Sequence, residues 1–392
     1  MQQYNDPAGG SPSNIGGQIR VDHYIKQALI EAKKETYFGV LADVTSMPKN
    51  MGKKIKRYHY VPLLDDANIN DQGLDATGAT IVDGNLYGSS KDVGTITSKM
   101  PTLSETGGRV NRVGFTRVEL EGSLEKYGFF DEYTKESLDF DTDADLEQHI
   151  NREMIFGANE ITEDLLQIDL LNAAGVMYYA GTAQSDAEMS GVSGSETEVT
   201  YGDLSRLSVE LDNNRTPKHT KIISGSRMTD TRVIRGGRVM YIGSELIQTI
   251  EQMEDYFGNQ AFISVAHYAD AGTLLNGEIG TIGQFRIVVV PEMMYWAGVG
   301  ANEGVNVGYR VTNSKYDVFP MLVVGDSSFT TIGFQTNGKT VKFNIKHAKP
   351  ESPESYATDP YGETGFMSIK WYYGFMALRT ERIAIIKTVA KW

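Results

Sequence analysis

The sequence predicts an α+β protein with more than one lobe. The chain has 392 residues, more than the roughly 250–300 that usually pack around one hydrophobic core. A long amphipathic helix is predicted to begin near residue 142, and strand-like segments precede and follow it, at 52–64, 112–130, 286–292 and 321–336. Strands and helices that are grouped, rather than regularly alternating, are typical of α+β folds.

The composition excludes several classes of protein. The chain has no cysteine, so it has no disulfide, cysteine nucleophile or thiolate metal site, and we expect it to fold in a reducing cytoplasm. The formal net charge of −14 argues against a dedicated nucleic-acid-binding surface, which is normally basic. No stretch reaches the ~18–20 continuous apolar residues of a membrane span.

Residues 1–18 are rich in Gly, Ser, Pro and Asn, a composition with little capacity to fold alone. They lack the basic start and the apolar run of a signal peptide. Two interpretations stay open, a frayed tail and an extended arm that binds another molecule. A first helix is predicted from about Asp22 to Tyr37, because one side of it is apolar at helical spacing; this side holds Val21, Ile25, Ala28, Leu29 and Ala32.

A long polar excursion follows a predicted strand at 52–64, in which Ile55, His59, Val61 and Leu63 share one face by the period of two. Residues 65–108 contain seven glycines (73, 78, 84, 88, 94, 107 and 108) and few apolar side chains, and the chain returns to strand-like sequence at 112–130. An isolated two-stranded ribbon is not stable in water, and structureless loops beyond ~12–15 residues are usually functional or disordered. We expect this excursion to obtain its order from a neighbouring molecule.

The strongest helical pattern follows. Thr142 to Asp145 match the start of a capping box, Gly175 and Gly181 are candidates to end the helix, and about thirty residues would span ~45 Å. Apolar residues recur at steps of three and four along it: Leu146, Ile150, Met154, Ala158, Ile161, Leu165, Ile168 and Leu171. We call this predicted helix the spine helix.

The second half of the chain mixes helices and strands after a polar loop at 184–198. The predicted elements are a helix at 203–213, a strand at 221–224, an amphipathic segment at 244–257, a buried strand at 286–292, strands at 321–325 and 330–336, and an aromatic closing strand or pair within 365–392.

One motif matches a nucleotide-binding pattern completely. Residues 333–340, GFQTNGKT, satisfy G-x-x-x-x-G-K-[ST], but a phosphate-binding loop also needs a helix that begins at Lys339. The residues that follow alternate instead, with Val341, Phe343 and Ile345 on one face. Asn337-Gly338 between two strands is a strong signal for a type I′ hairpin turn. The sequence therefore predicts a β-hairpin here.

The remaining catalytic and metal-binding candidates are weak. The six histidines, at 23, 59, 149, 219, 267 and 347, show no metal-ligand spacing. Four aspartates at 139, 141, 143 and 145 lead into a helix N-terminus, where negative charge is favoured, and they lack the glycine and terminal glutamate of an EF-hand. We expect no catalytic residue, no cofactor and no metal, and therefore no enzyme.

The densest basic patch consists of Lys53, Lys54, Lys56 and Arg57, beside Tyr58 and Tyr60. Basic and aromatic residues together are also found at nucleic-acid contacts. In an acidic protein we favour pairing with the carboxylates of a neighbour, so these four residues are candidate intersubunit contacts.

Four stretches, 47–63, 120–140, 316–334 and 358–378, resemble the major capsid proteins of N4-like tailed bacteriophages. The last holds an Asp-Pro…Gly…Lys-Trp pattern, formed by Asp359, Pro360, Gly362, Gly365, Lys370 and Trp371. The order of the parts resembles the HK97-type capsid fold. The segments 64–108 and 235–285 match nothing in the family that we can place.

The resemblance implies a division into five parts. These are an N-terminal arm and first helix (1–50), an extended two-stranded loop, or E-loop (51–119), a peripheral domain with the spine helix (120–199), an axial domain (200–339), and closing strands that return to the peripheral domain (340–392).

The resemblance also implies a function. The chain would be a late structural protein that self-assembles, as pentamers and hexamers, into the icosahedral shell of a virion enclosing double-stranded phage DNA. It would be assembled in the cytoplasm of the bacterial host, with scaffold, portal or decoration proteins as further partners, without sequence-specific DNA binding and without a membrane. No motif supports covalent cross-linking, so we expect a non-covalent shell. The alternatives are a phage tail or decoration binding module and, least favoured, a P-loop nucleotide-binding protein that uses Lys339.

Overall fold

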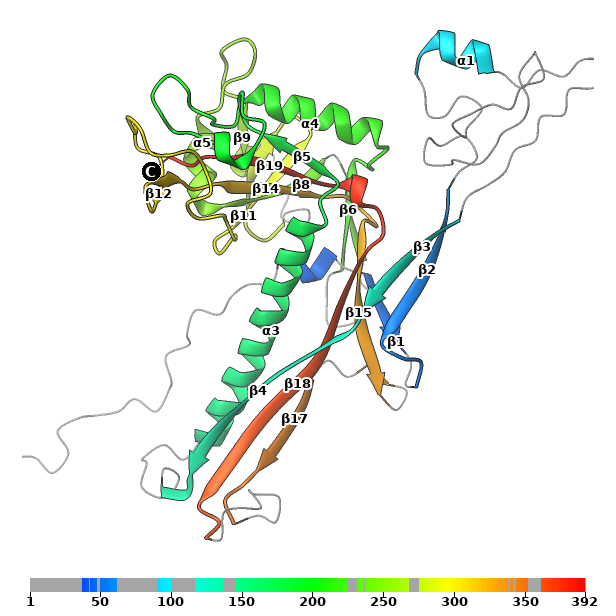
Figure 1. Cartoon of the computed structure of the whole chain (residues 1–392), viewed down its shortest axis with the longest axis vertical. Helices are drawn as coiled ribbons and strands as arrows, with labels where there is room; N and C mark the ends of the chain where they lie inside the picture. The colour runs from blue at the N-terminus through cyan, green and yellow to red at the C-terminus, as the bar shows by residue number, and fades with distance from the viewer. Residues whose placement is uncertain are drawn as a thin grey trace, which may run out of the picture. The chain divides into compact units, whose positions relative to one another are not determined.

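The computed structural model (Figure 1) describes residues 37–41, 43–47, 50–61, 91–99, 117–136, 146–223, 231–235, 237–267, 275–336, 339–340, 343–351 and 361–391. The predicted N-terminal arm, nearly all of the predicted first helix and the proposed capping residues Thr142 to Asp145 lie outside these ranges. Contacts between residues divide the chain into two compact units. The first comprises 1–35, 131–156 and 347–367, and the second comprises 36–130, 157–346 and 368–392.

The main core of the second unit lies on a mixed sheet of seven strands. In spatial order these are β5 (Val176–Tyr179), β19 (Ile383–Thr388), β14 (Phe319–Val324), β8 (Arg238–Gly243), β11 (Phe285–Val290), β10 (Glu278–Ile282) and β9 (Phe262–Ser264). Every residue of β8, β11, β14 and β19 is buried, as expected for strands whose sequences are continuous apolar runs. The predicted buried strand at 286–292 is thereby confirmed.

Helix α4 (Tyr201–Asn213) packs on this sheet (Figure 1) and buries Leu204, Leu207 and Leu211 in the same core. It begins at the N-cap Thr200, whose backbone N–H donates to Asp203 Oδ2 at 3.1 Å while Asp203 N–H donates to Thr200 Oγ1 at 3.4 Å. The predicted start at Asp203 was therefore too late, since that aspartate is the third residue of the helix and completes a capping box.

The predicted amphipathic segment at 244–257 is shorter than expected. A 3₁₀ turn and helix α5 (Ile247–Glu251) form only its first part. Beyond Gln252 the chain turns tightly, with Gly258 at φ 75°, a backbone conformation that glycine adopts without strain. The helix therefore ends before this turn, although the apolar residues at 244–257 recur at helical spacing.

A second sheet of six strands holds the other long strands. It consists of β1 (Asp43–Met47), β15 (Phe329–Thr336), β18 (Thr364–Ala377), β17 (Phe343–Ala348), β16 (Lys339–Thr340), which pairs with β15, and β4 (Glu125–Thr134), which pairs with β18. The closing segment thus divides between the two sheets, because β18 belongs to this sheet and β19 to the seven-stranded one.

The spine helix is confirmed as α3 (Leu146–Asn172). Its predicted apolar row is only partly right: Met154, Ala158 and Leu171 are buried, but Ile161 and Ile168 are 39% and 42% exposed. The helix instead buries a second set, Leu166, Gln167 and Leu170. The repeat of three and four residues describes one straight stripe, whereas the buried face of this helix moves around its axis along its length.

The last turn of α3 is tied to β18 by a polar contact. Tyr373 donates its hydroxyl to Asp169 Oδ2 at 2.7 Å. Burial raises the pKa of the Asp169 carboxyl above its ordinary value, and the nearby Glu125 acts in the same direction, while the bond from Tyr373 partly opposes both. The carboxylate is therefore held in surroundings that favour its protonated form.

We predict that Asp169 makes the subunit less stable as the pH rises. Its pKa is higher in the folded than in the unfolded chain, so the folded state binds more protons between the two pKa values and stability falls as pH rises through that window. Asp169→Asn, which still accepts from Tyr373, should flatten this dependence in urea unfolding measured at a series of pH values. An unchanged slope would contradict the assignment.

The first unit is held by contacts of its own. Tyr133 hydrogen-bonds His347 through its hydroxyl, Lys135 pairs with Glu351, and the N–H of Lys135 donates to the carbonyl of Glu363 at 2.7 Å. The residues of this unit before position 36 lie outside the described ranges.

The remaining elements are short. They are helix α1 (Val93–Lys99), the hairpins β6 (His219–Ile223) with β7 (Thr231–Arg235) and β12 (Val311–Thr312) with β13 (Lys315–Tyr316), and 3₁₀ turns at Gly39–Leu41, Asp186–Glu188, Ser244–Leu246, Val265–His267 and Thr380–Arg382. Helix α1 lies within the excursion at 65–108, where the sequence predicted no helix or strand. In the described residues no helix is long and apolar enough to cross a membrane.

Candidate functional site

A two-stranded ribbon separates the long excursion from the rest of the chain (Figure 1). Strand β2 (Lys54–Tyr60) pairs antiparallel with β3 (Arg117–Ser123) along the full length of both, from Lys54 opposite Ser123 to Tyr60 opposite Arg117. The predicted strands at 52–64 and 112–130 are thereby confirmed. We call β2 and β3 together the ribbon.

One face of the ribbon is covered by diagonal cross-strand pairs. Lys54 pairs with Glu121, Lys56 pairs with Glu119, and the Arg117 guanidinium lies 4.3 Å from the centre of the Tyr58 ring. Hydrogen bonding to Glu119 raises the pKa of Lys56, and bonding to Lys54 lowers the pKa of Glu121. Such exposed pairs contribute little to stability, but they fix the side chains of this face in one arrangement.

The opposite face fixes the base of the ribbon to the six-stranded sheet. Ile55 and Leu120 pack against a cluster formed by Met47, Leu124, Ile332 and Met376. Gly122 allows this approach, because a Cβ there would lie 2.6 Å from Ile332 Cδ1 and 3.0 Å from Met376 Cβ.

We predict that Gly122→Val destabilises the subunit by about 1–3 kcal/mol, the usual cost of inserting atoms into a packed contact. Ser123→Val places the same valine side chain at the adjacent, exposed position and serves as the matched control. Urea unfolding of both variants compares them directly, and equal midpoints would show that the ribbon base is not tightly packed.

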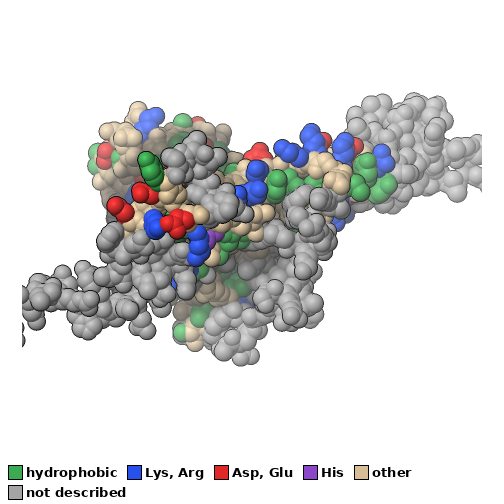
Figure 2. Space-filling view, turned by 90° about the horizontal axis from the view of Figure 1, so that it is seen from below, with side chains coloured by type: hydrophobic (Ala, Val, Ile, Leu, Met, Phe, Trp, Pro, Cys, Tyr) green, Lys and Arg blue, Asp and Glu red, His purple; other side chains and the backbone are tan. Residues whose placement is uncertain are grey.

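The distal part of the ribbon is exposed and aromatic. Tyr58, Tyr60 and Val118 are 48%, 59% and 39% exposed. Figure 2 shows basic side chains beside apolar ones on the face that it draws. Exposed aromatic residues next to cations are typical of protein interfaces.

The four predicted contact residues do not share one environment. Lys54 and Lys56 are paired within the chain, and Lys53 is exposed at the end of the ribbon. Arg57 lies on the other face and lines a pocket of about 260 Å³, which we call the basic pocket. Sequence reasoning missed the second arginine of this pocket, Arg379, because it follows β18 and no local pattern connects it with β2.

The nucleotide-binding look-alike is a β-hairpin, as predicted. Strands β15 and β16 pair antiparallel, with Thr336 opposite Lys339 and Gln335 opposite Thr340. Lys339 therefore lies on a strand, and the next described element is strand β17, so the helix that a phosphate-binding loop requires does not begin there. The turn residues 337 and 338, and with them the predicted turn type, lie outside the described residues.

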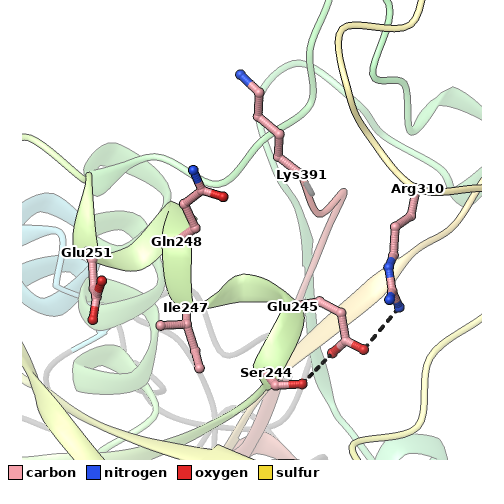
Figure 3. Close-up of a pocket in the computed structure, with 7 residues that line it drawn as sticks. All are labelled: Ser244, Glu245, Ile247, Gln248, Glu251, Arg310 and Lys391. Atoms are coloured by element: carbon pink, nitrogen blue, oxygen red, sulfur yellow. Dashed lines mark hydrogen bonds and ion pairs between the residues drawn. The ribbon is translucent and has the colours of Figure 1, made fainter.

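A pocket of about 390 Å³ lies beside α5 (Figure 3). Arg310 Nη1 is 3.0 Å from Glu245 Oε1, and Ser244 Oγ lies 3.4 Å from the same carboxylate. The remaining lining residues include Glu251 and Lys391. A serine next to a carboxylate, with no histidine in the lining, does not form a nucleophile and base pair.

The tight turn after α5 exposes two aromatic rings. Asp255 accepts hydrogen bonds from the N–H groups of Phe257 (2.8 Å) and Asn259 (2.9 Å), and these bonds lower the pKa of its carboxyl. Tyr256 contacts the ring of Tyr201 edge-on at 5.1 Å, whereas Phe257 is 87% exposed. The turn is thus fixed by its own hydrogen bonds while it presents an unburied apolar side chain.

The described residues contain no candidate metal site, because no three His, Asp or Glu side chains among them are arranged to hold an ion. What the described chain offers is contact surface: a fixed ribbon with an aromatic distal half, a basic pocket at its base and an aromatic turn.

The fold itself defines the class of protein. A seven-stranded mixed sheet, a long spine helix, a second sheet of long strands and a two-stranded ribbon make up the HK97-type fold of tailed-phage capsid proteins. The structure is similar to the capsid of Ralstonia phage GP4 (TM-score 0.57, 11% identity, 98% of this chain and 99% of that one). It is equally similar to the capsid of cyanophage Pam1 (TM-score 0.57, 10% identity, 97% and 99%).

Sequence comparison gives the family. The profile of the family described as phage capsid protein matches residues 117–388. The chain is 62% identical over 390 residues to the major capsid protein of Pseudomonas phage KPP21, covering 99% of this chain and 97% of that one. The chain belongs to the phage capsid protein family. The resemblance predicted from the sequence, and the capsid fold that it implied, are confirmed.

Proposed function

We propose that this chain is the major capsid subunit that self-assembles into the icosahedral shell enclosing the DNA of a tailed phage. The observation that carries the proposal is the 62% identity to a major capsid protein over 99% of the chain. At that identity, and over that length, two chains share their fold and the surfaces that the fold presents.

The ribbon supports an assembly role. A two-stranded ribbon gains little stability from its own hydrogen bonds, and the distal half of this one leaves Tyr58 and Tyr60 largely exposed. A neighbouring subunit that covers these rings would bury apolar area and order the loop at the same step. Ordering on docking keeps free subunits soluble and makes assembly cooperative.

The finer organisation belongs to the same proposal. The ribbon and its excursion are the E-loop, α3 is the spine of the peripheral domain, and the seven-stranded sheet is the axial domain. Pentamers and hexamers form through head-to-tail contacts that close into rings. Scaffold, portal or decoration proteins join this shell in the bacterial cytoplasm, and the net charge of −14 suits a lining that encloses DNA without gripping it.

The role is structural and requires no catalysis. The strongest motif for an enzyme, at 333–340, forms a hairpin. In the pocket beside α5, where Ser244 lies next to a carboxylate, no histidine lines the pocket to act as a base. These observations support a shell held together without a covalent step.

The test is to express the chain alone and to examine the product by sedimentation and electron microscopy. Icosahedral particles are the expected result. A stable monomer, or a small ring that never forms shells even when scaffold and portal proteins are supplied, would favour a tail or decoration module instead.

A further inference from the structure

The basic pocket is formed by four segments that are distant in the sequence, one of which is β3 with Leu120. Arg57 and His59 come from β2, Ser327 from the turn between β14 and β15, and Arg379 from the end of β18, around a space of about 260 Å³. Ile55 and Leu120 fix the ribbon base on the six-stranded sheet, so the walls of the pocket are held relative to one another.

The pocket concentrates positive charge in an acidic protein. None of its lining residues is acidic. In the described part of the chain Arg57 and Arg379 form no ion pair, in contrast to Lys54 and Lys56 on the other face of the ribbon. Burial is the main cause that lowers the pKa of the nearby Arg382. Repulsion from Arg379 lowers this pKa further, as expected where two cations lie close together.

Asp326, which precedes the pocket residue Ser327, has partners of its own. Asp326 Oδ2 lies 3.7 Å from His219 Nε2 and accepts from Ser327 Oγ at 3.4 Å. Two further donors in the same segments, Ser328 Oγ and Arg382 Nε, are buried and have no hydrogen-bond partner within the described ranges. Buried polar groups are normally satisfied, so these two atoms are exceptions beside the pocket.

We propose that the basic pocket binds a carboxylate side chain from a second copy of this chain. The inference rests on the proposed shell function and names a contact within it. Arginine pairs bidentately with carboxylates, and two arginines and a histidine are among the residues that line the pocket.

Charge complementarity identifies the occupant as protein. Each copy carries 51 Asp and Glu against 37 Lys and Arg, so a second copy has more carboxylates than cations to offer to the pocket. DNA is bound by many cations spread along a groove or a face, whereas here two arginines and one histidine converge in a single concave site.

Charge reversal tests the proposal. We expect Arg57→Glu and Arg379→Glu each to lower the yield of sedimenting shells by about tenfold or more, as loss of one partner of a desolvated ion pair does at interfaces. The melting temperature of the free subunit should stay unchanged. Lys370→Glu, which makes the same charge change at an exposed position of β18 outside the pocket, is the matched control and should assemble normally.

Carbodiimide coupling identifies the bound group. Arg57→Lys and Arg379→Lys keep the charge and introduce amines that a carbodiimide joins to a carboxylate in contact. In shells assembled from a mixture of nitrogen-14 and nitrogen-15 subunits, mass spectrometry should find mixed-isotope peptides that join position 57 or 379 to an Asp or Glu. Joined peptides of one isotope only would overturn the proposal, because the carboxylate would then belong to the same copy.

Two further outcomes are decisive. If the charge-reversed variants assemble as well as the Lys370→Glu control, no carboxylate bound in the pocket supports assembly, and the proposal is wrong. If they form normal empty shells but fail to retain DNA, the anion is a DNA phosphate, which also overturns it. Failure of the unaltered chain to form shells would instead count against the proposed function.

Discussion

Deleting residues 66–105 is expected to leave a folded, soluble subunit that forms no shells. The deletion removes α1 and most of the excursion but no strand of either sheet. Residues 61–65 and 106–116 remain to connect β2 with β3, so the ribbon can still close. The cores of both sheets lose nothing, because their buried residues lie in other parts of the chain.

The measurement separates folding from assembly. Unfolding by urea should give the same midpoint for the deleted and the full-length chain, while sedimentation should show only small species for the deleted chain. Mixing the two chains provides a control: deleted subunits that enter shells of full-length subunits would still have the acceptor surface. Normal particles from the deleted chain alone, seen by electron microscopy, would contradict the role given to the excursion.

Local patterns predicted the spine helix and several of the long strands in this structure. The buried strand at 286–292 and the strands at 321–325 and 330–336 follow from continuous or alternating apolar residues. The spine helix follows from a repeat at helical spacing. The hairpin that replaces the phosphate-binding loop followed from the Asn337-Gly338 pair and the alternation after it. In each case the signal lies within a few residues of the structure that it specifies.

Some local signals were present but misread. Thr200 and Asp203 are spaced as a capping box, yet the helix was predicted to begin at the aspartate. Ile161 and Ile168 fit the apolar repeat of α3 but are exposed, because the side of a helix that is buried depends on which elements pack against each part of it. Periodicity along one helix carries no information about those partners.

The candidate site was the least predictable part. Lys54 and Lys56 were expected to bind a neighbour, but their partners within the chain, Glu119 and Glu121, were not recognised, because a cross-strand partner depends on register. Arg379 joins Arg57 in one pocket only through the packing of the ribbon on the six-stranded sheet. Contacts of this kind arise from tertiary structure and leave no short-range pattern.

Arg286→Ala is expected to destabilise the subunit more than the other substitutions described above. Arg286 donates to both oxygens of Glu278, from Nε to Oε1 at 2.7 Å and from Nη2 to Oε2 at 2.6 Å, and the Glu278 side chain has no exposed surface. Removing the guanidinium leaves a buried carboxylate without its cation, a change that typically costs about 3–5 kcal/mol.

The matched comparison is the double variant Arg286→Met with Glu278→Leu, which removes both charges and keeps apolar volume. Replacing a buried ion pair by apolar residues of similar size is often neutral, so the double variant should unfold at a higher urea concentration than Arg286→Ala. Glu278 lies opposite Val288 of β11, next to a register shift between the two strands. Loss of the ion pair should therefore also lower shell yield, through unfolding of the seven-stranded sheet. If the single and double variants unfold at the same urea concentration, the ion pair does not specify the position of β10, and packing alone holds this strand in place.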